Sequence, residues 1–158
     1  MKRTIARLAR RLGRYRPVVF FARTVIVPID RVVAKLTRGK LITGGLRDLP
    51  ALLLTTTGRR SGEPRTVPLL YLPDGDTFIV IGSNFGQQHH PAWSLNLLSN
   101  PDATVTVRGK RMTVRAHLAQ GEEHDTLLLA LKDLWPGYSS YEQWATRRTM
   151  RIFRLSPR

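Results

Sequence analysis

The chain has 158 residues, of which 42% are apolar and 8% aromatic, enough for one hydrophobic core, and it has no cysteine. One folded domain is therefore expected, and disulfides, cysteine nucleophiles, cysteine-bound zinc and iron–sulfur centres are excluded. The formal net charge is +15, from 26 Lys and Arg against 11 Asp and Glu. Residues 1–40 hold twelve of the basic residues and one acid, Asp30, so the charge indicates a basic arm attached to a near-neutral domain, residues 41–158.

The arm, residues 1–40, is predicted to be helical and amphipathic. Apolar residues recur at spacings of three and four both before and after Pro17, which should break or restart the helix. The first stripe is Ile5, Leu8, Leu12 and Tyr15, and the second is Ala22, Val25, Ile26, Ile29, Val32, Val33 and Leu36.

Three interpretations of the arm are open. A basic helix lying on an anionic membrane fits best, and it would hold a cytoplasmic protein, monomer or homodimer, at the inner face of the plasma membrane. A helix that covers the domain or forms a dimer interface is the second. Nucleic acid is not expected as a partner, because no helix-turn-helix, zinc pattern or interleaved aromatic residues accompany the charge. Arg23 and Pro28 interrupt the apolar run, which argues against a membrane-spanning helix or a secretory signal.

From Leu49 onward the pattern changes to short strands. Strands are predicted over 51–57, 65–72 and 77–82, the last two joined by a Pro-Asp-Gly-Asp turn. A helix should begin at Pro91 and end before Pro101.

The remainder predicts strands over 103–107, 112–118 and 150–155 and helices over 122–135 and 138–147. Around the turn 108–111, the residues expected to face the core are Val105, Val107, Met112, Val114, Ala116 and Leu118. Tight turns join most strands, so the sheet should be antiparallel. Six short strands with helices over the openings predict a mainly β, closed or half-closed barrel with flanking helices.

The sequence carries no self-contained catalytic motif: a nucleophile elbow, a phosphate loop and paired carboxylates are all missing from it. Any reaction is therefore expected to depend on a bound cofactor. His89 and His90 are adjacent and have no carboxylate near them in sequence, so no metal is expected. A histidine at the helix N-cap, or a cofactor contact, fits this pair better.

Two loops favour anions. Arg59, Arg60, Ser61 and Arg65 crowd one strand connection, and guanidinium groups match phosphate and carboxylate geometry. The loop 83–90 leads into a helix N-terminus, where free N–H groups also attract anions. Together they would suit a phosphorylated or polyacidic cofactor, although a solvated hairpin tip is the alternative for the first loop. Trp93, Trp135, Tyr138 and Tyr141 either wall a flat ring system or pack in the core.

The segment 53–65, Leu-Leu-Thr-Thr-Thr-Gly-Arg-Arg-Ser-Gly-Glu-Pro-Arg, resembles the hallmark of the deazaflavin-dependent nitroreductase family of actinobacteria. The similarity extends over residues 45–158, and the basic N-terminus resembles the family's membrane-associating arm in character only. It continues in Pro68-Leu69, Asp74-Gly75, Ser83, Pro91-Ala92-Trp93, Asn96-Leu97, Asn100-Pro101, Pro136-Gly137-Tyr138, Tyr141-Glu142-Gln143-Trp144 and Arg148-Thr149.

This resemblance implies a split β-barrel similar to FMN-binding oxidoreductases. It implies coenzyme F420, an 8-hydroxy-5-deazaflavin whose tail carries a phosphate and γ-linked glutamates, with FMN as the alternative cofactor. The implied reaction is hydride transfer from reduced F420 to quinones or to nitro and other conjugated acceptors. A deazaflavin-binding or membrane-tethered module without turnover is the alternative function.

The resemblance also carries over site residues. Tyr138 and Ser83 are implied as donors to the reduced carbonyl, and Trp135, Tyr138 and Tyr141 as the substrate pocket. Departures from the family are Asn84 in place of a usual lysine, Phe85 and Gln87 in a usually glycine-rich stretch, and Ser94 in place of a common tyrosine. The implied coenzyme contacts are Arg59, Arg60, Ser61, Arg65, Thr66, Val67, Pro68, Leu69, Leu70, Ile81, Gly82, Ser83, Asn84, Ala92, Trp93, Ser94, Leu95, Asn96 and Tyr138.

Overall fold

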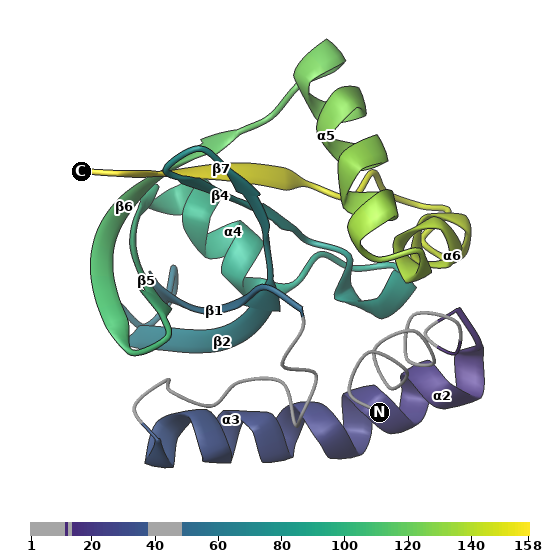
Figure 1. Ribbon diagram of the computed structural model, residues 1–158, viewed down its shortest axis with the longest axis horizontal. Coiled ribbons are helices and arrows are strands. Elements are labelled where there is room, and N and C mark those ends of the chain that lie inside the picture. Colours follow the sequence, from purple (N-terminus) through teal and green to yellow (C-terminus); the bar gives the residue numbers. More distant parts are fainter. Residues whose placement is uncertain (1–11, 13, 38–48) are drawn as a thin grey trace.

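The strands form one curled antiparallel sheet (Figure 1). The computed structural model describes residues 12, 14–37 and 49–158. The strand order is β2-β1-β5-β6-β7-β4-β3, so the two edge strands, β2 and β3, are consecutive in the chain. The predicted mainly β split barrel with flanking helices is confirmed. Its strands are β1 (Ala51–Thr57), β2 (Pro64–Leu70), β3 (Leu72–Asp74), β4 (Thr77–Ile81), β5 (Asp102–Val107), β6 (Lys110–Leu118) and β7 (Ile152–Pro157).

The structure has seven strands where about six were predicted, because the segment expected as one strand over 65–72 forms two. β2 pairs with β1, and β3 pairs with β4, so the chain changes its partner strand at Tyr71. Pro68 and Pro73 lie in these two strands. Proline has no N–H for a ladder bond and is tolerated at the edges of a sheet, which are the positions of β2 and β3.

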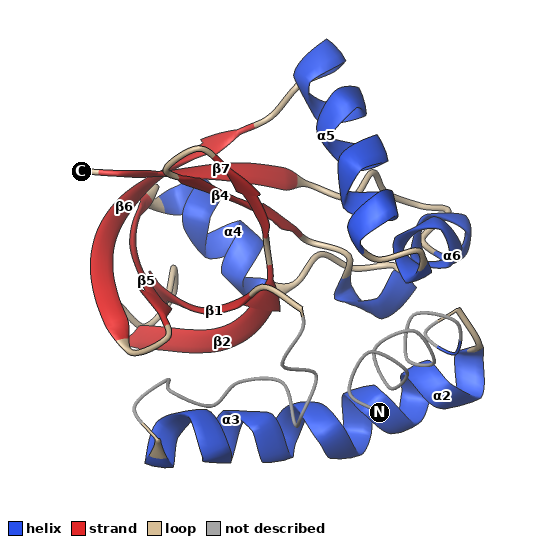
Figure 2. Cartoon of the chain, viewed as in Figure 1, coloured by secondary structure: helices blue, strands red, loops and turns tan. Residues whose placement is uncertain are grey.

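One buried cluster fills the inside of the curl, where the strands curve around α4 (Ala92–Ser99) (Figure 2). Every inward-facing residue predicted for the β5–β6 hairpin belongs to this cluster or packs against it, so that prediction is confirmed. The fully or nearly buried members are Leu52, Leu54, Val80, Trp93, Leu97, Val105, Val114, Phe153 and Leu155.

A second cluster lies where α5 (Gly121–Leu134) and α6 (Gly137–Trp144) pack beside the ends of β4 and β7. Leu127, Leu128 and Leu131 supply the face that α5 buries. Tyr138 and Tyr141 supply the buried face of α6. Both helices match the predicted helical segments to within a few residues.

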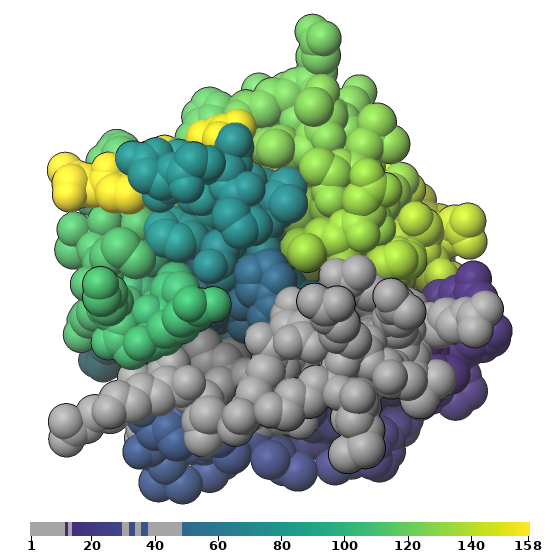
Figure 3. All heavy atoms as spheres, in the orientation of Figure 1, coloured from purple at the N-terminus to yellow at the C-terminus, as the bar shows by residue number. Residues whose placement is uncertain are grey.

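An N-terminal helix crosses the molecule below the sheet and α6 (Figure 3). It consists of α2 (Arg16–Phe21), the π-helical segment η1 (Ala22–Ile26) and α3 (Val27–Leu36). Pro17 stands in its first turn, where its missing N–H costs nothing, as predicted. Pro28 has no N–H to donate one turn back, and the turn before it widens to a π-helix.

The described part of the arm both contacts the domain and exposes apolar side chains. Val19 is only 6% exposed and belongs to the second cluster, while the Arg16 guanidinium lies 5.2 Å from the centre of the Trp144 ring. In contrast, Phe20 is 62% exposed and Leu36 is 77% exposed. Within residues 14–37 and 49–158, no helix has the length and apolarity needed to cross a membrane. Of the stripe predicted before Pro17, Ile5 and Leu8 lie outside the described residues, and Leu12 and Tyr15 are exposed.

Candidate coenzyme site

The arginine loop, residues 58–63, joins β1 to β2 in a tight turn. The Gly58 N–H donates to the Glu63 carbonyl at 2.8 Å, and the Gly62 N–H donates to the Gly58 carbonyl at 2.7 Å. A Cβ at position 58 would lie 2.7 Å from Ser61 Oγ and 3.1 Å from the Glu63 carbonyl oxygen, so any larger residue there would shift the loop. Gly62 has a φ of +70°, in the left-handed region that favours glycine.

The arginines of this loop, and Arg65 at the start of β2, face outward. Arg59, Arg60 and Arg65 are all exposed. Among the described residues their guanidinium groups make one hydrogen bond, a long one of 3.5 Å from Arg65 Nη2 to Ser61 Oγ. Glu63, the only acid in the loop, forms no ion pair with a described residue. These guanidinium groups are therefore free to bind an external anion, and they fit a phosphorylated, polyacidic tail.

Asn96 on α4 fixes the start of the loop. Its side chain is buried, donates from Nδ2 to Thr56 Oγ1 at 3.0 Å, and accepts the Arg59 N–H on Oδ1 at 3.1 Å. The amide therefore satisfies its polar atoms on β1 and on the first arginine of the loop. Asn96 was predicted as a coenzyme contact, and the structure gives its side chain a second task, which is to orient the loop.

The second loop connects β4 to α4 through the 3₁₀ turn η2 (Asn84–Gly86). Asn84 has a φ of 45° and Phe85 a φ of 54°, a left-handed conformation that is unfavourable for residues with a Cβ. Gly86 follows with a φ of +75°, and a Cβ there would lie 3.0 Å from the Trp144 side chain.

Aromatic side chains pack beside this loop. The Tyr141 ring contacts the rings of Phe85 and Tyr138, each at 6.0 Å between centroids, and that of Trp144 at 5.7 Å. Burial raises the pKa of Tyr138, and the neighbouring Tyr141 raises it further. Burial also raises the pKa of Tyr141, although a hydrogen bond with Trp135 opposes this shift. Both phenols therefore keep their protons at neutral pH and can donate them.

The structure brings the predicted pocket residues Trp135, Tyr138 and Tyr141 together at α6. It directs other predicted contacts inward. Trp93 packs against Phe153 inside the curl, with centroids 5.8 Å apart. Ser94 is fully buried and its hydroxyl donates to the Pro91 carbonyl at 3.0 Å.

The histidine pair does not cap α4. The N-cap residue is Pro91, and no side chain bonds to the first turn from that position, so the predicted N-cap histidine is wrong. His90 Nδ1 is buried and has no hydrogen-bond partner among the described residues. Burial, followed by the charges of Arg151 and Arg148, lowers the pKa of His90 and favours its neutral form.

Two sets of contacts were not predicted from the sequence. Arg16 and Val19 bring the arm against the aromatic residues of α6. Val19 lies four residues after Tyr15 on one helical face, a spacing that could have extended the first stripe. Arg148 appeared only as part of the family resemblance, and its side chain contacts the second loop.

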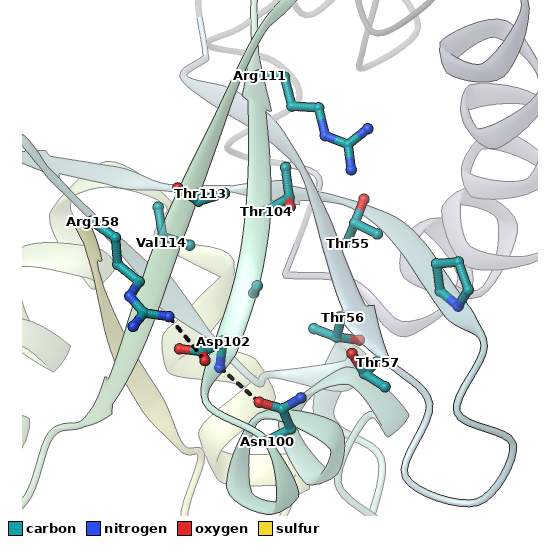
Figure 4. Close-up of a pocket in the computed structure, with 12 residues that line it drawn as sticks. Thr55, Thr56, Thr57, Asn100, Asp102, Thr104, Arg111, Thr113, Val114 and Arg158 are labelled. Carbon is teal, nitrogen blue, oxygen red and sulfur yellow. Dashed lines mark hydrogen bonds and ion pairs between the residues drawn. The ribbon is translucent and has the colours of Figure 1, made fainter.

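A hollow of about 340 Å³ lies on the outside of the sheet, over β1, β5 and β6 (Figure 4). Threonines line much of it, and Arg158 pairs across it with Asp102 at 3.0 Å. Thr104 and Thr113 face outward there, as the alternation of the hairpin predicted. None of the residues predicted to bind coenzyme or substrate lines this hollow.

The half-barrel sheet with flanking helices is similar to solved structures of F420-dependent reductases. A solved F420-H2-dependent reductase, FDR-A, superposes with a TM-score of 0.62 at 30% identity, over 68% of this chain and 94% of that one. A domain-swapped dimer superposes with a TM-score of 0.63 at 28% identity, over 82% of this chain and 99% of that one.

The family model of the F420H(2)-dependent quinone reductases matches residues 30–157. The chain therefore belongs to the F420H(2)-dependent quinone reductase family. A Mycobacterium tuberculosis protein assigned by name to these reductases, Rv3178, is 34% identical over 119 residues, which are 75% of this chain and 99% of that protein. Another from M. tuberculosis, the F420H(2)-dependent quinone reductase Rv1261c, is 41% identical over 76 residues, which are 48% of this chain and 51% of that protein. The chain is an oxidoreductase and its cofactor is coenzyme F420.

Proposed function

We propose that this protein reduces quinones with F420H2 and accepts nitro or other conjugated compounds of similar shape. The bound coenzyme supplies the hydride. The observation that carries the proposal is the exposure of Arg59, Arg60 and Arg65 at the start of an edge strand, where they form no ion pair with a described acid. Guanidinium groups bind phosphate and carboxylate groups by charge-assisted hydrogen bonds, and the tail of F420 is a polyanion.

Different segments are proposed to hold the acidic tail and the ring system of the coenzyme. Arg59, Arg60, Ser61 and Arg65 hold the acidic tail. The ring system lies along β2 at 66–70, against the end of β4 and the second loop at 81–84, and over the start of α4 at 92–96. In the last segment Trp93, Ser94 and Asn96 act mainly through the backbone they hold, because their side chains are buried.

Tyr138 is the proposed hydrogen-bond donor to the acceptor carbonyl. Its buried phenol keeps its proton at neutral pH, which is the state that a donor requires. Ser83, at the end of β4, is the second candidate donor. Trp135 and Tyr141 flank the acceptor, and the packing of Tyr141 against Phe85 and Trp144 keeps this wall rigid and excludes water.

The acceptor side is proposed to meet an anionic membrane through the arm. Phe20, Phe21, Ile29, Val32 and Leu36 present exposed apolar side chains on a helix whose opposite side contacts the domain through Val19. Such a helix can insert apolar side chains among lipids while the barrel stays in water. This arrangement would give the site access to a lipid-soluble quinone.

The test of activity is the absorbance of F420H2 under anaerobic conditions, with menadione as the acceptor and FMNH2 as the control donor. Oxidation of F420H2 that depends on both protein and menadione supports the proposal. Binding of F420H2 with no oxidation by any quinone would favour the non-catalytic module instead. Failure to bind F420H2 at low salt would refute the proposed site.

The test of membrane contact is sedimentation with vesicles that contain the anionic lipid phosphatidylglycerol, compared with neutral phosphatidylcholine vesicles. Phe20→Ser with Ile29→Ser should release the protein from the vesicles and leave menadione reduction unchanged. Leu129→Ser is the matched control, because Leu129 is 65% exposed on α5. Equal sedimentation of all three proteins would contradict the proposal.

A further inference from the structure

Arg148 makes three hydrogen bonds to one loop. It follows α6 in the chain and is only partly exposed. Its Nη1 donates to the Gly82 carbonyl at 2.8 Å, its Nη2 to the Ser83 carbonyl at 2.7 Å, and its Nε to the Gln87 carbonyl at 2.9 Å. One guanidinium group therefore joins the beginning and the end of the loop that links β4 to α4.

Gln88 provides a second link between this loop and the end of α6. Its Nε2 donates to the Trp144 carbonyl, and its Oε1 accepts the Arg147 N–H at 3.0 Å. Residues 82–88 are thus attached to residues 144–148 by side chains from both segments. No other part of the described chain is tied to this loop by as many side-chain bonds.

The loop has a reason to need such links. Asn84 and Phe85 are consecutive residues with a Cβ in the left-handed region, with φ of 45° and 54°. Strained backbone of this kind persists only where surrounding contacts over-determine it. Within the loop, Asn84 Nδ2 donates to the His89 carbonyl at 3.0 Å and Gln87 Nε2 to the Asn84 carbonyl at 3.2 Å. These local bonds hold the turn, and Arg148 holds its two ends.

Electrostatics do not favour a cation at this place. Burial lowers the pKa of Arg148, and the nearby Arg151 lowers it further. Arg151 is its charged neighbour, His90 lies nearby with its neutral form favoured, and no described Asp or Glu pairs with Arg148. With no described acidic partner, this partly buried cation is held by its three hydrogen bonds to backbone carbonyls. The feature that no other side chain reproduces is the planar fork with its fixed donor directions.

We propose that Arg148 is a positioning residue for the reaction. It sets the backbone of residues 82–84, where the proposed function places the coenzyme ring, so this inference rests on that function. Loss of the fork lets the strained turn relax, which moves Ser83 and the loop carbonyls away from the ring. Both the affinity for F420H2 and the rate of hydride transfer should then fall. KM for menadione should change less, because the loop reaches the proposed acceptor wall mainly through the contact of Phe85 with Tyr141.

The experiment compares Arg148→Lys, Arg148→Ala and the control Arg147→Gln. The Arg147 side chain is exposed and forms no hydrogen bond with a described residue of the loop, and the substitution keeps its backbone N–H bond to Gln88. Arg148→Lys keeps the charge and removes the fork. We expect its Kd for F420H2 to rise by about tenfold or more and kcat to fall, with a smaller change in KM for menadione. Arg147→Gln should remain within about twofold of the wild type in all three constants.

Chemical rescue separates positioning from a general loss of structure. Guanidinium chloride at non-denaturing concentration should restore part of the F420H2 affinity of Arg148→Ala, and sodium chloride at equal concentration should not. In the absence of coenzyme, amide hydrogen exchange over residues 82–88 should accelerate in Arg148→Lys and remain slow in Arg147→Gln.

Each outcome decides something different. A wild-type protein that does not bind F420H2 refutes the proposed function. The exchange measurement alone then tests whether Arg148 holds the backbone of residues 82–88. A wild type that binds, with Arg148→Lys binding and reacting equally well, overturns the inference and leaves the function intact. Loss of activity in Arg148→Ala with no rescue and with exchange accelerated over the whole domain would also overturn it, because the residue would then be merely structural.

Discussion

Asn96 Oδ1 accepts a hydrogen bond from the backbone N–H of Arg59 at 3.1 Å. This bond joins α4 to the first arginine of the arginine loop, 37 positions away in the sequence. The same amide donates to Thr56 on β1. A residue inside the barrel thereby orients the loop that is proposed to hold the coenzyme tail. Folding of the interior and binding of the coenzyme are coupled through this one side chain.

Replacing Asn96 should therefore affect both properties. Asn96→Ala leaves the Thr56 hydroxyl and the Arg59 N–H without their partner, and buried groups in that state cost about 1–3 kcal/mol each before relaxation. We expect the free energy of unfolding, measured with urea, to fall by about 2 kcal/mol and the Kd for F420H2 to rise. Asn100→Ala is the control: it removes a bond to the Asp102 N–H and should lower stability alone. Equal coenzyme affinity in both variants would contradict the coupling.

Arg60→Ala should weaken the binding of F420H2 by about 1 kcal/mol at low salt, because Arg60 is exposed and an exposed charge contact is worth little more. The effect should shrink as salt is added and screens the remaining charges. Isothermal titration at two ionic strengths measures it. Arg108→Ala, at the exposed β5–β6 turn, removes the same charge elsewhere and should have no effect. An identical loss in both variants would mean that only net charge matters.

Tyr138→Phe should lower kcat for menadione by about tenfold, which corresponds to the loss of one hydrogen bond of about 1.4 kcal/mol to the acceptor carbonyl. KM for menadione should change little, since the ring remains. Stopped-flow oxidation of bound F420H2 reports the step directly. An unchanged rate would show that Ser83 or water donates instead.

The raised pKa values of Tyr138 and Tyr141 also predict how stability depends on pH. Each phenol is harder to ionise in the folded than in the unfolded protein, where its pKa is about 10. Their contribution is therefore complete below pH 10, and it is lost as pH rises from 10 toward the higher folded-state pKa. Urea unfolding at pH 8.5 and pH 11 should show the decline, and Tyr138→Phe should make it smaller. A decline of equal size in the variant would show that other groups cause it.

Val19→Ala should destabilise the domain, because Val19 is buried among side chains of α5 and α6. The loss of two buried carbon atoms corresponds to about 1–2 kcal/mol. Phe20→Ala, one position along on the exposed face, should leave the unfolding midpoint unchanged. Equal midpoints for both variants would mean that the arm does not contribute to the stability of the barrel.

Alternation and turn chemistry were sufficient to predict the local elements. Val105 and Val114 face inward and Thr104 and Thr113 outward because side chains alternate along a strand whatever lies beyond it. The positions of the arginine loop and of α4, α5 and α6 could be predicted because glycine and proline residues mark the ends of these segments. The division between β2 and β3 could not be predicted, because it depends on which strand each half pairs with, and the partner of β3 closes the other edge of the sheet.

The basic arm, the arginine cluster and the resemblance to deazaflavin-dependent enzymes were already present in the sequence, because they depend on composition and on consecutive residues. Only the tertiary structure decided that Val19 and Arg16 contact the domain, that Asn96 orients Arg59, and that Arg148 joins Gly82 to Gln87. The last of these contacts spans more than 60 positions. Hydrogen bonds of one side chain to distant backbone carbonyls leave no periodicity in a single sequence, since any residue can supply the carbonyl.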